Sequence, residues 1–455
     1  MGRSRQALRW LCALTGGLLV SACVTAPLPV TPGQSAASQV LAVHCARLID
    51  GVSPVVLIDQ TVLMVDGKVA SVGRHLHLPR AAQRLELPRH TCLPGLLDLH
   101  THLTDIPQNT ADFSIYPRRS PEEHYVFARQ NAKAMLEAGF TTARDVGAYV
   151  GGLDRELRDD INAGHTPGPR MQVAIAFLTI AGGGGDMLLP GFPAREAKTP
   201  LSRLRMGVAR GPEEFAVKAQ RLIDQGADLL KVIASGAVLA LGGVPGSPEM
   251  KPEELAAVAR VAHANGRRLA AHAHGAQSVK DAILAGADTI EHASFIDEEG
   301  LLLAREHHVA LAMDIYNGDY IDTEGRRQGW PAEFLQKNID TTEVQRRAFT
   351  RAVQLGVPVV FATDAAVYPH GLNARQFRVM VERGMTPMQA IQAATSVAAG
   401  FMGWSDRVGQ LTPGHYGDLL AVEGDPLMDI TRLEQPAAVV KGGEVVRWPP
   451  GPPAQ

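Results

Sequence analysis

Amphipathic segments and short apolar runs alternate along the chain from about residue 93 onward. Five amphipathic segments carry apolar residues at helical spacing, and a glycine follows each of them within two residues; they cover 128–137, 214–224, 253–264, 278–285 and 344–355. A glycine at this place is typical of the left-handed residue that ends a helix. The pattern therefore predicts five helices, each of which leads into a short strand.

Eight short apolar runs are predicted to be strands, and they cover 96–103, 140–143, 171–178, 229–233, 268–271, 289–290, 309–313 and 357–361. Regular alternation of strand and helix favours a parallel sheet. Eight such units in roughly 300 residues predict an α/β fold of the (β/α)8 TIM barrel type. An open doubly wound sheet alternates in the same way and is the alternative.

The two flanks of this region have a different pattern. Strand-like runs surround the hairpin turn signal Asp66-Gly67 in the segment 40–92, and further strand-like runs fill 415–448. Both flanks therefore look all-β. We expect them to pair into one small discontinuous β-sandwich domain beside the barrel.

The N-terminus has the features of a targeting segment. Three arginines precede an apolar run at 11–20, and the run Val-Ser-Ala-Cys follows at 20–23. This order is typical of a secretory signal, and the small residues before Cys23 resemble a bacterial lipobox that would make Cys23 the lipidated first mature residue. An ordinary cleaved signal with an incidental cysteine is the alternative. The residue after Cys23 is Val24 and not aspartate, and in the lipoprotein pattern this favours the outer membrane. We therefore expect a protein that is lipid-anchored there and faces the periplasm.

These observations predict how the chain divides. The expected parts are a signal peptide at 1–22, a flexible tether at 23–39, the β-sandwich domain at 40–92 plus 403–448, the barrel at 93–402, and a Pro-rich tail at 449–455. Beyond the N-terminus no apolar run is long enough for a membrane-spanning helix. We therefore expect contact with the membrane only through the lipid anchor.

Composition and cysteine usage narrow the function. The 455 residues are 45% hydrophobic and 20% charged, as in an ordinary globular protein, and the net charge of -3 gives no basic field for nucleic acid. Once Cys12 is removed with the signal and Cys23 is acylated, Cys45 and Cys92 remain. Export would place them in an oxidising compartment, where they form a disulfide or stay as two buried thiols.

The first predicted barrel strand carries candidate metal ligands. It reads Leu-Leu-Asp-Leu-His-Thr-His at 96–102, and because strand side chains alternate, Asp98, His100 and His102 share one face. That face is the barrel interior if the leucines pack against the helices. Two imidazoles at this spacing can chelate one cation, although a hydrogen-bonded pair of interior histidines is the alternative.

Four further residues of suitable type lie on other predicted strands. Lys231 lies within the fourth strand, where a buried cation is costly, while His272, His292 and Asp364 lie at the ends of the fifth, sixth and eighth strands. The carboxyl end of the strands is the catalytic face of this fold. Taken singly, Asp364 could be a helix N-cap and Lys231 a partner in a surface ion pair.

Six motifs together resemble those of the amidohydrolase superfamily, in particular the branch of Xaa-Pro dipeptidases, N-acyl-amino-acid hydrolases and ochratoxin-degrading amidohydrolases. They begin at residues 93, 141, 231, 271, 290 and 363 and read Leu-Pro-Gly-Leu-Leu-Asp-Leu-His-Thr-His, Thr-Thr-Ala-Arg-Asp-Val-Gly, Lys-Val-Ile-Ala-Ser-Gly, Ala-His-Ala-His-Gly, Ile-Glu-His and Thr-Asp-Ala. The resemblance covers about 40 to 446.

This resemblance implies a binuclear metal-dependent amidohydrolase with two divalent ions, of which Zn2+ is the first expectation. His100 and His102 would bind one ion with Asp364, and His272 and His292 would bind the second. Lys231, carboxylated by CO2, would bridge the two. Metal-hydroxide attack on an amide carbonyl, with Asp364 as the proton carrier, is the expected mechanism.

The expected substrates are dipeptides or N-acyl amino acids, including amides of the ochratoxin A type. A free carboxylate on the leaving part requires a cation or hydrogen-bond donor, and the candidates are His274, Tyr368, His370 and Arg375. One departure concerns specificity: relatives often show Thr-Gly-Gly-His-Gly after the third strand, where this chain has Ala-Gly-Gly-Gly-Gly at 181–185.

Two alternatives remain open from the sequence. An imidazolonepropionase-like cyclic amidase or a lactonase would use the same site on another substrate. A non-catalytic, lipid-anchored binding protein would keep the barrel without the chemistry. The sequence determines neither the metal nor whether the chain forms a homo-oligomer.

Overall fold

The computed structural model describes residues 39–187, 189 and 192–448, which fall within one compact unit, Gln39–Gln455. The predicted signal peptide, the lipidation site Cys23, all of the tether except its last residue, and the tail 449–455 lie outside the described residues.

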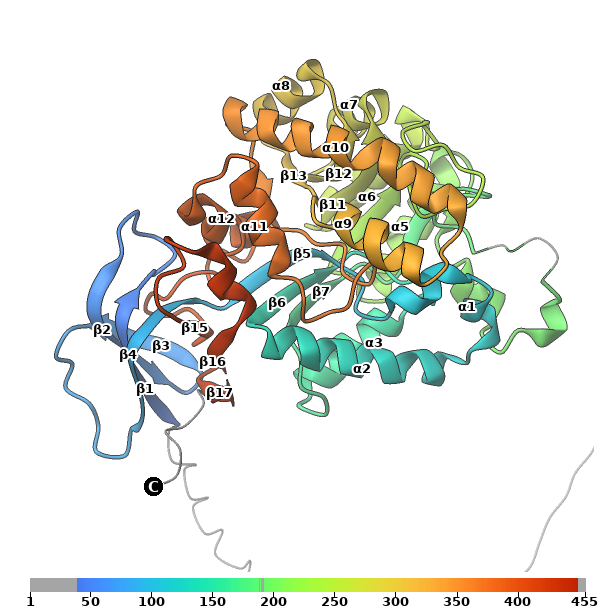
Figure 1. Cartoon of the computed structure of the whole chain (residues 1–455). Helices are drawn as coiled ribbons and strands as arrows, with labels where there is room; N and C mark the ends of the chain where they lie inside the picture. The colour runs from blue at the N-terminus through green and yellow to red at the C-terminus, as the bar shows by residue number, and fades with distance from the viewer. Residues whose placement is uncertain (1–38, 188, 190–191, 449–455) are drawn as a thin grey trace, which may run out of the picture. The chain divides into compact units, whose positions relative to one another are not determined.

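Parallel strands form the centre of the described chain (Figure 1). They are β5 (Leu96–Thr101), β6 (Phe140–Asp145), β7 (Arg170–Val173), β8 (Phe177–Ile180), β9 (Val208–Ala209), β10 (Leu229–Ile233), β11 (Arg268–Gly275), β12 (Thr289–Phe295), β13 (Ala310–Ala312) and β14 (Val359–Val360). The first and last of these meet, because the backbone of Leu99 donates to Phe361 and that of Asp364 donates to His100. The ring therefore closes, and the predicted (β/α)8 barrel is confirmed.

The third strand of the barrel is interrupted. The predicted strand 171–178 is divided into β7 and β8 by a break at which Ile175 has a φ of 71°. β7 pairs with β6, whereas β8 pairs with β10 on the other side. The break thus lets one predicted strand join both of its neighbours.

Helices surround the strands on the outside. The longer ones are α2 (Pro121–Glu137), α3 (Leu153–Asn162), α5 (Gly211–Asp224), α6 (Pro252–Ala264), α7 (Ala276–Ala285), α8 (Glu298–Glu306), α10 (Ala332–Leu355), α11 (Arg375–Glu382), α12 (Pro387–Ala393) and α13 (Ser396–Met402). Short turns of helix are η1 (Pro107–Ala111), α1 (Ile115–Arg118), η2 (Ala194–Glu196), α4 (Leu201–Leu204), α9 (Asn317–Tyr320), η3 (Ile321–Gly325) and η4 (Ile430–Glu434). All five predicted helices are present, and the glycine after each has a positive φ.

Two helices begin well before the positions that their apolar pattern predicts. α2 begins at Pro121 because Ser120 and Glu123 cap it reciprocally, with the backbone N–H of Ser120 donating to Glu123 at 2.7 Å. α10 begins at Ala332, twelve residues before the predicted start. Its early turns bury polar side chains such as Asn338 toward a cavity, so they lack an apolar stripe.

The two ends of the chain build a second sheet. It is seven-stranded and mixed, in the order β17-β16-β15-β4-β1-β2-β3, so strands from the two ends of the chain lie side by side in it (Figure 1). The strands are β1 (Val40–Leu48), β2 (Leu57–Val65), β3 (Lys68–Gly73), β4 (Gln83–Pro94), β15 (Leu419–Glu423), β16 (Pro436–Lys441) and β17 (Glu444–Arg447). This sheet confirms the small discontinuous β domain, and its strands are hydrogen-bonded as one sheet.

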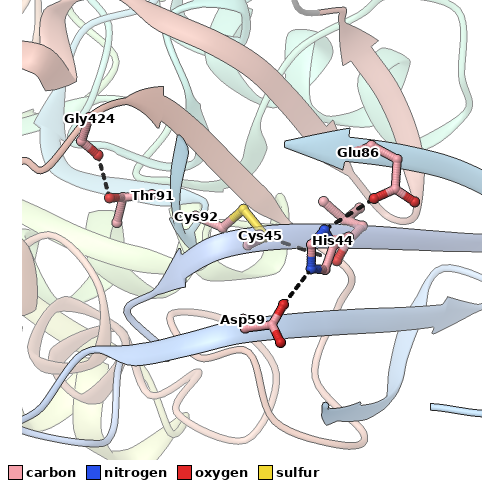
Figure 2. The surroundings of a disulfide bond; sticks show 8 residues. His44, Cys45, Asp59, Glu86, Thr91, Cys92 and Gly424 are labelled. Carbon is pink, nitrogen blue, oxygen red and sulfur yellow. Dashed lines mark hydrogen bonds and ion pairs between the residues drawn. A yellow bond between two sulfur atoms is a disulfide. The ribbon is translucent and has the colours of Figure 1, made fainter. Parts of the chain in front are cut away.

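A disulfide joins Cys45 of β1 to Cys92 of β4 (Figure 2). The two strands are parallel neighbours, and both cysteines are fully buried in the apolar core of the terminal sheet. The bond closes a separation of 47 residues beside the point where β4 leads into the barrel.

Within the described residues, no helix combines the length and the apolar character that crossing a bilayer requires.

Candidate metal centre

The predicted metal ligands line a single cavity at the carboxyl ends of the barrel strands. Each comes from a different strand or from the residues directly after one, except that His100 and His102 both belong to β5 and its end. The lining includes all six: His100, His102, Lys231, His272, His292 and Asp364. The structure therefore brings together residues separated by up to 264 positions in the sequence.

Alternation along β5 directs its histidines inward. Leu97 and Leu99 are buried in an apolar cluster with Ala398 and Met402 of α13, on the outer face of the barrel. His100, the residue after Leu99, faces the interior, and His102 follows directly after the strand. This is the arrangement that the Leu-Asp-Leu-His-Thr-His pattern predicts.

The first group of candidate ligands gathers around Asp364. Its Oδ1 lies 3.3 Å from Nε2 of His100 and 3.2 Å from Nε2 of His102. Burial would raise the pKa of Asp364, but the imidazoles of His100 and His102 outweigh burial and hold that pKa well below its ordinary value. One oxygen thus faces two imidazole nitrogens, as in a chelating site.

The second group consists of three imidazoles. The ring centroids of His272 and His292 are 4.5 Å apart, and His274 lies 4.7 Å from the former and 4.8 Å from the latter. Burial, with a further contribution from His292, lowers the pKa of His272 far below its usual range and that of His274 to about 3. The rings of His272 and His274 are therefore neutral near pH 7, the form that binds metal.

Lys231 lies within the same cavity and is 1% exposed. Burial lowers the pKa of its amine to about 8, and the nearby carboxylates of Glu291 and Asp364 oppose that change. A neutral amine is therefore accessible close to physiological pH.

A layer of hydrogen-bond partners orients three of the histidines through Nδ1. Nδ1 of His100 lies 2.7 Å from Glu291, Nδ1 of His102 lies 2.7 Å from the carbonyl of Gly147, and Nδ1 of His292 lies 2.9 Å from Asp314. Because these acceptors require a proton on Nδ1, the neutral form of each ring carries its lone pair on Nε2. The lone pairs are thus available to a cation.

Glu291 anchors this outer layer. Its second oxygen accepts from Nη2 of Arg144 at 2.9 Å, and Arg144 also donates through Nε to the carbonyl of Leu99 at 2.6 Å. Burial opposes ionisation, but Arg144 and His100 hold the pKa of Glu291 below its ordinary value. A buried, charged pair therefore fixes the ring of His100.

Two candidate ligands have unusual backbones. His292 has a φ of 68° and Asp364 a φ of 54°, in the left-handed region that side chains other than glycine rarely adopt. Such strain persists when the surroundings determine it, and it is concentrated at functional sites. The strain therefore supports a functional interpretation of both residues.

Asp98 has a different role from its neighbours on the strand. It does not line the cavity; it accepts from Thr363 Oγ1 at 2.6 Å and from Asn373 Nδ2 at 2.8 Å. Burial raises its pKa to about 6. Asp98 thus ties β5 to the segment that carries Asp364.

Of the four residues predicted to contact substrate, the cavity lining contains His274 alone. Tyr368 is fully buried, Nε2 of His370 lies 3.1 Å from the carbonyl of His102, and Arg375 donates to Tyr316 Oη at 2.9 Å. None of the three is among the described residues that line the cavity. The prediction missed this because the loop after β14 has no periodicity that would fix side-chain directions.

Sequence reasoning also missed the outer layer of the site. Glu291 and Arg144 lie in the motifs already noted, but they are 147 positions apart, and Glu291 is 191 positions from His100. Gln345 of α10, which donates to Asp314 at 2.9 Å, lies in a helix with no motif. The one available signal was the presence of charged residues inside otherwise apolar strands.

Comparison with known proteins agrees with this geometry. A model of the amidohydrolase family matches residues 91–446. Ochratoxinase from Aspergillus niger is 29% identical over 402 residues, which cover 84% of this chain and 82% of the relative. An imidazolonepropionase from Cereibacter sphaeroides is 24% identical over 397 residues, covering 84% and 92%. Among solved structures, a Xaa-Pro dipeptidase with bound methionine in its active site has a TM-score of 0.82 at 32% identity, covering 90% of this chain and 99% of that one.

Proposed function

Because the chain belongs to the amidohydrolase family, whose members are metal-dependent hydrolases, we propose that it is a binuclear enzyme that hydrolyses dipeptides or N-acyl amino acids. That the protein is a hydrolase of amide or peptide bonds follows from the family and from its ochratoxinase and dipeptidase relatives. The number of ions and the substrate are the proposal.

The residues present fit divalent ions. Nε2 of His272 is buried without a hydrogen-bond partner, which is costly unless a further group binds it. His100, His292 and Asp364 offer ligand atoms within 4.8 Å of one another, as do His272, His274 and His292. Imidazole nitrogens and carboxylate oxygens are donors that suit Zn2+.

The observation that carries the proposal is the convergence of these donors with Lys231. His100, His102 and Asp364 would hold one ion, and His272 and His292 the other. Lys231 would bind both through a carbamate, since its lowered pKa makes the neutral amine available for reaction with CO2. Carboxylation would also turn a buried cation into an anionic ligand and so remove its desolvation cost.

The chemistry of the ions and that of the residues are complementary. Bound divalent ions polarise a carbonyl and make hydroxide available near neutral pH. Asp364, whose low pKa keeps it ionised, accepts the proton of the attacking water as the new C–O bond forms. It then delivers that proton to the nitrogen as the C–N bond breaks. His274, the predicted substrate contact that lines the cavity, would hold a carboxylate or carbonyl oxygen of the substrate.

The second candidate is a cyclic amidase of the imidazolonepropionase type, which the similarity to that enzyme favours. A screen of dipeptides, N-acyl amino acids, cyclic amides and lactones separates the candidates. The proposal predicts turnover of a linear amide that leaves a free amino acid. Turnover confined to cyclic amides or lactones would contradict it.

A further inference from the structure

A row of aromatic rings runs along one wall of the cavity. Phe177 lies with its ring centroid 5.6 Å from that of His102, Tyr149 follows at 5.0 Å from Phe177, and Tyr116 lies 4.9 Å from Tyr149. Phe113 completes the row, 6.1 Å from both tyrosines. The rings are tilted or T-shaped relative to one another, so the wall offers edges and faces to a further ring. The row begins at a candidate ligand and leads away from it.

The remaining wall is poor in positive charge. Among the described residues that line the cavity, Lys231 is the one lysine or arginine, and it lies among the candidate ligands. Ile233, Val238 and Leu239 contribute apolar surface. The empty space, counted with the part open to solvent, is about 1090 Å³.

The glycine run at 182–185 borders this cavity, and three of its members need to be glycine. Gly182 has a φ of +77°, and a Cβ on Gly183 would lie within 3.0 Å of Glu249, Thr179 and Ile180. A Cβ on Gly185 would lie 3.0 Å from that of Phe177. Backbone conformation or close packing therefore explains these three glycines.

Gly184 has neither requirement. Its φ lies outside the left-handed region, and a Cβ there would meet Cγ2 of Ile233 at 3.5 Å and Cβ of Ala237 at 3.6 Å, which are ordinary contact distances. Gly184, Ile233 and Ala237 all line the cavity. The fold would accept a side chain at this position, and the absence of one leaves space in the cavity.

The space is held open by fixed contacts. The backbone N–H of Gly184 donates to Glu249 at 2.9 Å, and that of Gly182 donates to Asp186 at 2.9 Å. Asp186 in turn pairs with Arg205 at 2.7 Å. The loop is thus anchored on both sides of the vacant position.

We propose that the substrate carries a bulky aromatic group on one side of the scissile amide, and that Gly184 is the specificity-determining position that makes room for it. The ring would lie along the aromatic row, with its outer part above Gly184. This inference rests on the proposed function for the bond that is cleaved. The part that concerns aromatic binding stands on the cavity alone.

Binding of acetylnaphthalene, a ketone with no amide bond to hydrolyse, tests the inference on the purified full-length protein. Titration calorimetry would compare the wild type with Gly184→Leu, and with Gly400→Leu as a control on α13, where nothing lies within 4 Å of a Cβ. We expect the Gly184→Leu variant to bind about ten-fold or more weakly, the effect of filling space that a ligand needs, and the control to bind as the wild type does. Gly184→Val serves as the second variant if the leucine prevents folding, which thermal unfolding would reveal. No binding by the wild type, or equal binding by all variants, would overturn the inference.

Kinetics separate this inference from the proposed function. The wild type should have a higher kcat/KM for naphthoyl-glycine than for acetyl-glycine, and Gly184→Leu should reverse that order. Preference of the wild type for acetyl-glycine would overturn the aromatic inference and leave amide hydrolysis intact. Hydrolysis of neither compound would count against the proposed function, while the binding experiment would still decide the inference.

Discussion

Asp364 is the residue on which the proposed proton transfer depends. It contacts the Nε2 atoms of His100 and His102 and stays ionised among them. We expect Asp364→Asn to lower kcat by about 10²- to 10⁴-fold, because an amide cannot accept and return the proton. Steady-state kinetics with metal content measured in parallel would show this. Asp322→Asn, at an exposed surface ion pair, is the control; turnover by Asp364→Asn within a few-fold of the wild type would reject the role.

Glu291 should act on metal binding through His100. Removing its charge with Glu291→Gln weakens the hold on Nδ1 of that ring, and partners of this kind typically account for about 10- to 100-fold in metal affinity. Competition with a chelator would measure the loss. Glu298→Gln, which breaks an exposed pair with Arg351, should leave affinity unchanged. Equal affinities for the two variants would mean that Glu291 has a purely structural role.

At the residue scale, the sequence predicted the side-chain directions that follow from strand alternation. The alternation along β5 correctly placed His100 and His102 in the interior, and strand ends correctly indicated His272, His292 and Asp364 as neighbours. The partnership of Glu291 with His100 spans 191 positions and has no local signature.

At the scale of elements, the barrel could be predicted from helix-ending glycines and short apolar runs. A glycine after each of the five predicted helices, followed by an apolar run, located five of the strands, and apolar runs alone indicated the other three. The predicted boundaries were wrong where a helix directs polar residues toward the cavity, as in the first turns of α10. They also failed at Ile175, where a positive φ divides one strand into β7 and β8.

The disulfide between β1 and β4 should stabilise the terminal sheet. Replacing Cys45 and Cys92 together by serine should lower the free energy of unfolding by about 2–4 kcal/mol, because the cross-link restricts the unfolded chain. Denaturant titration of the variant measures this, and reduced wild type should match it. Free thiols at both Cys45 and Cys92 in the denatured, unreduced wild type would contradict the bond.

At the scale of the whole molecule, described strands from before and after the barrel join in one sheet. β15 pairs with β4, which continues into β5, so the terminal sheet is joined directly to the strand that carries His100. The sequence could predict that both flanks are β, but not which strands pair. Register between segments more than 300 residues apart depends on packing and not on any local pattern.

Export and lipid anchoring remain proposals, and the disulfide supports an oxidising compartment. We expect Cys23→Ser, expressed in a bacterial host, to move the protein from the membrane fraction to the soluble one. Cys12→Ser, in the predicted signal, is the matched control and should remain with the membrane. The same distribution for both variants would refute the anchor.

The proposed mechanism requires two ions bound where β5, β10, β11, β12 and the segment after β14 converge. Elemental analysis of the purified, active protein tests this requirement most directly. We predict two divalent ions per chain in the wild type, and loss of bound metal together with activity in Lys231→Ala. An active wild-type preparation without stoichiometric metal would contradict the account.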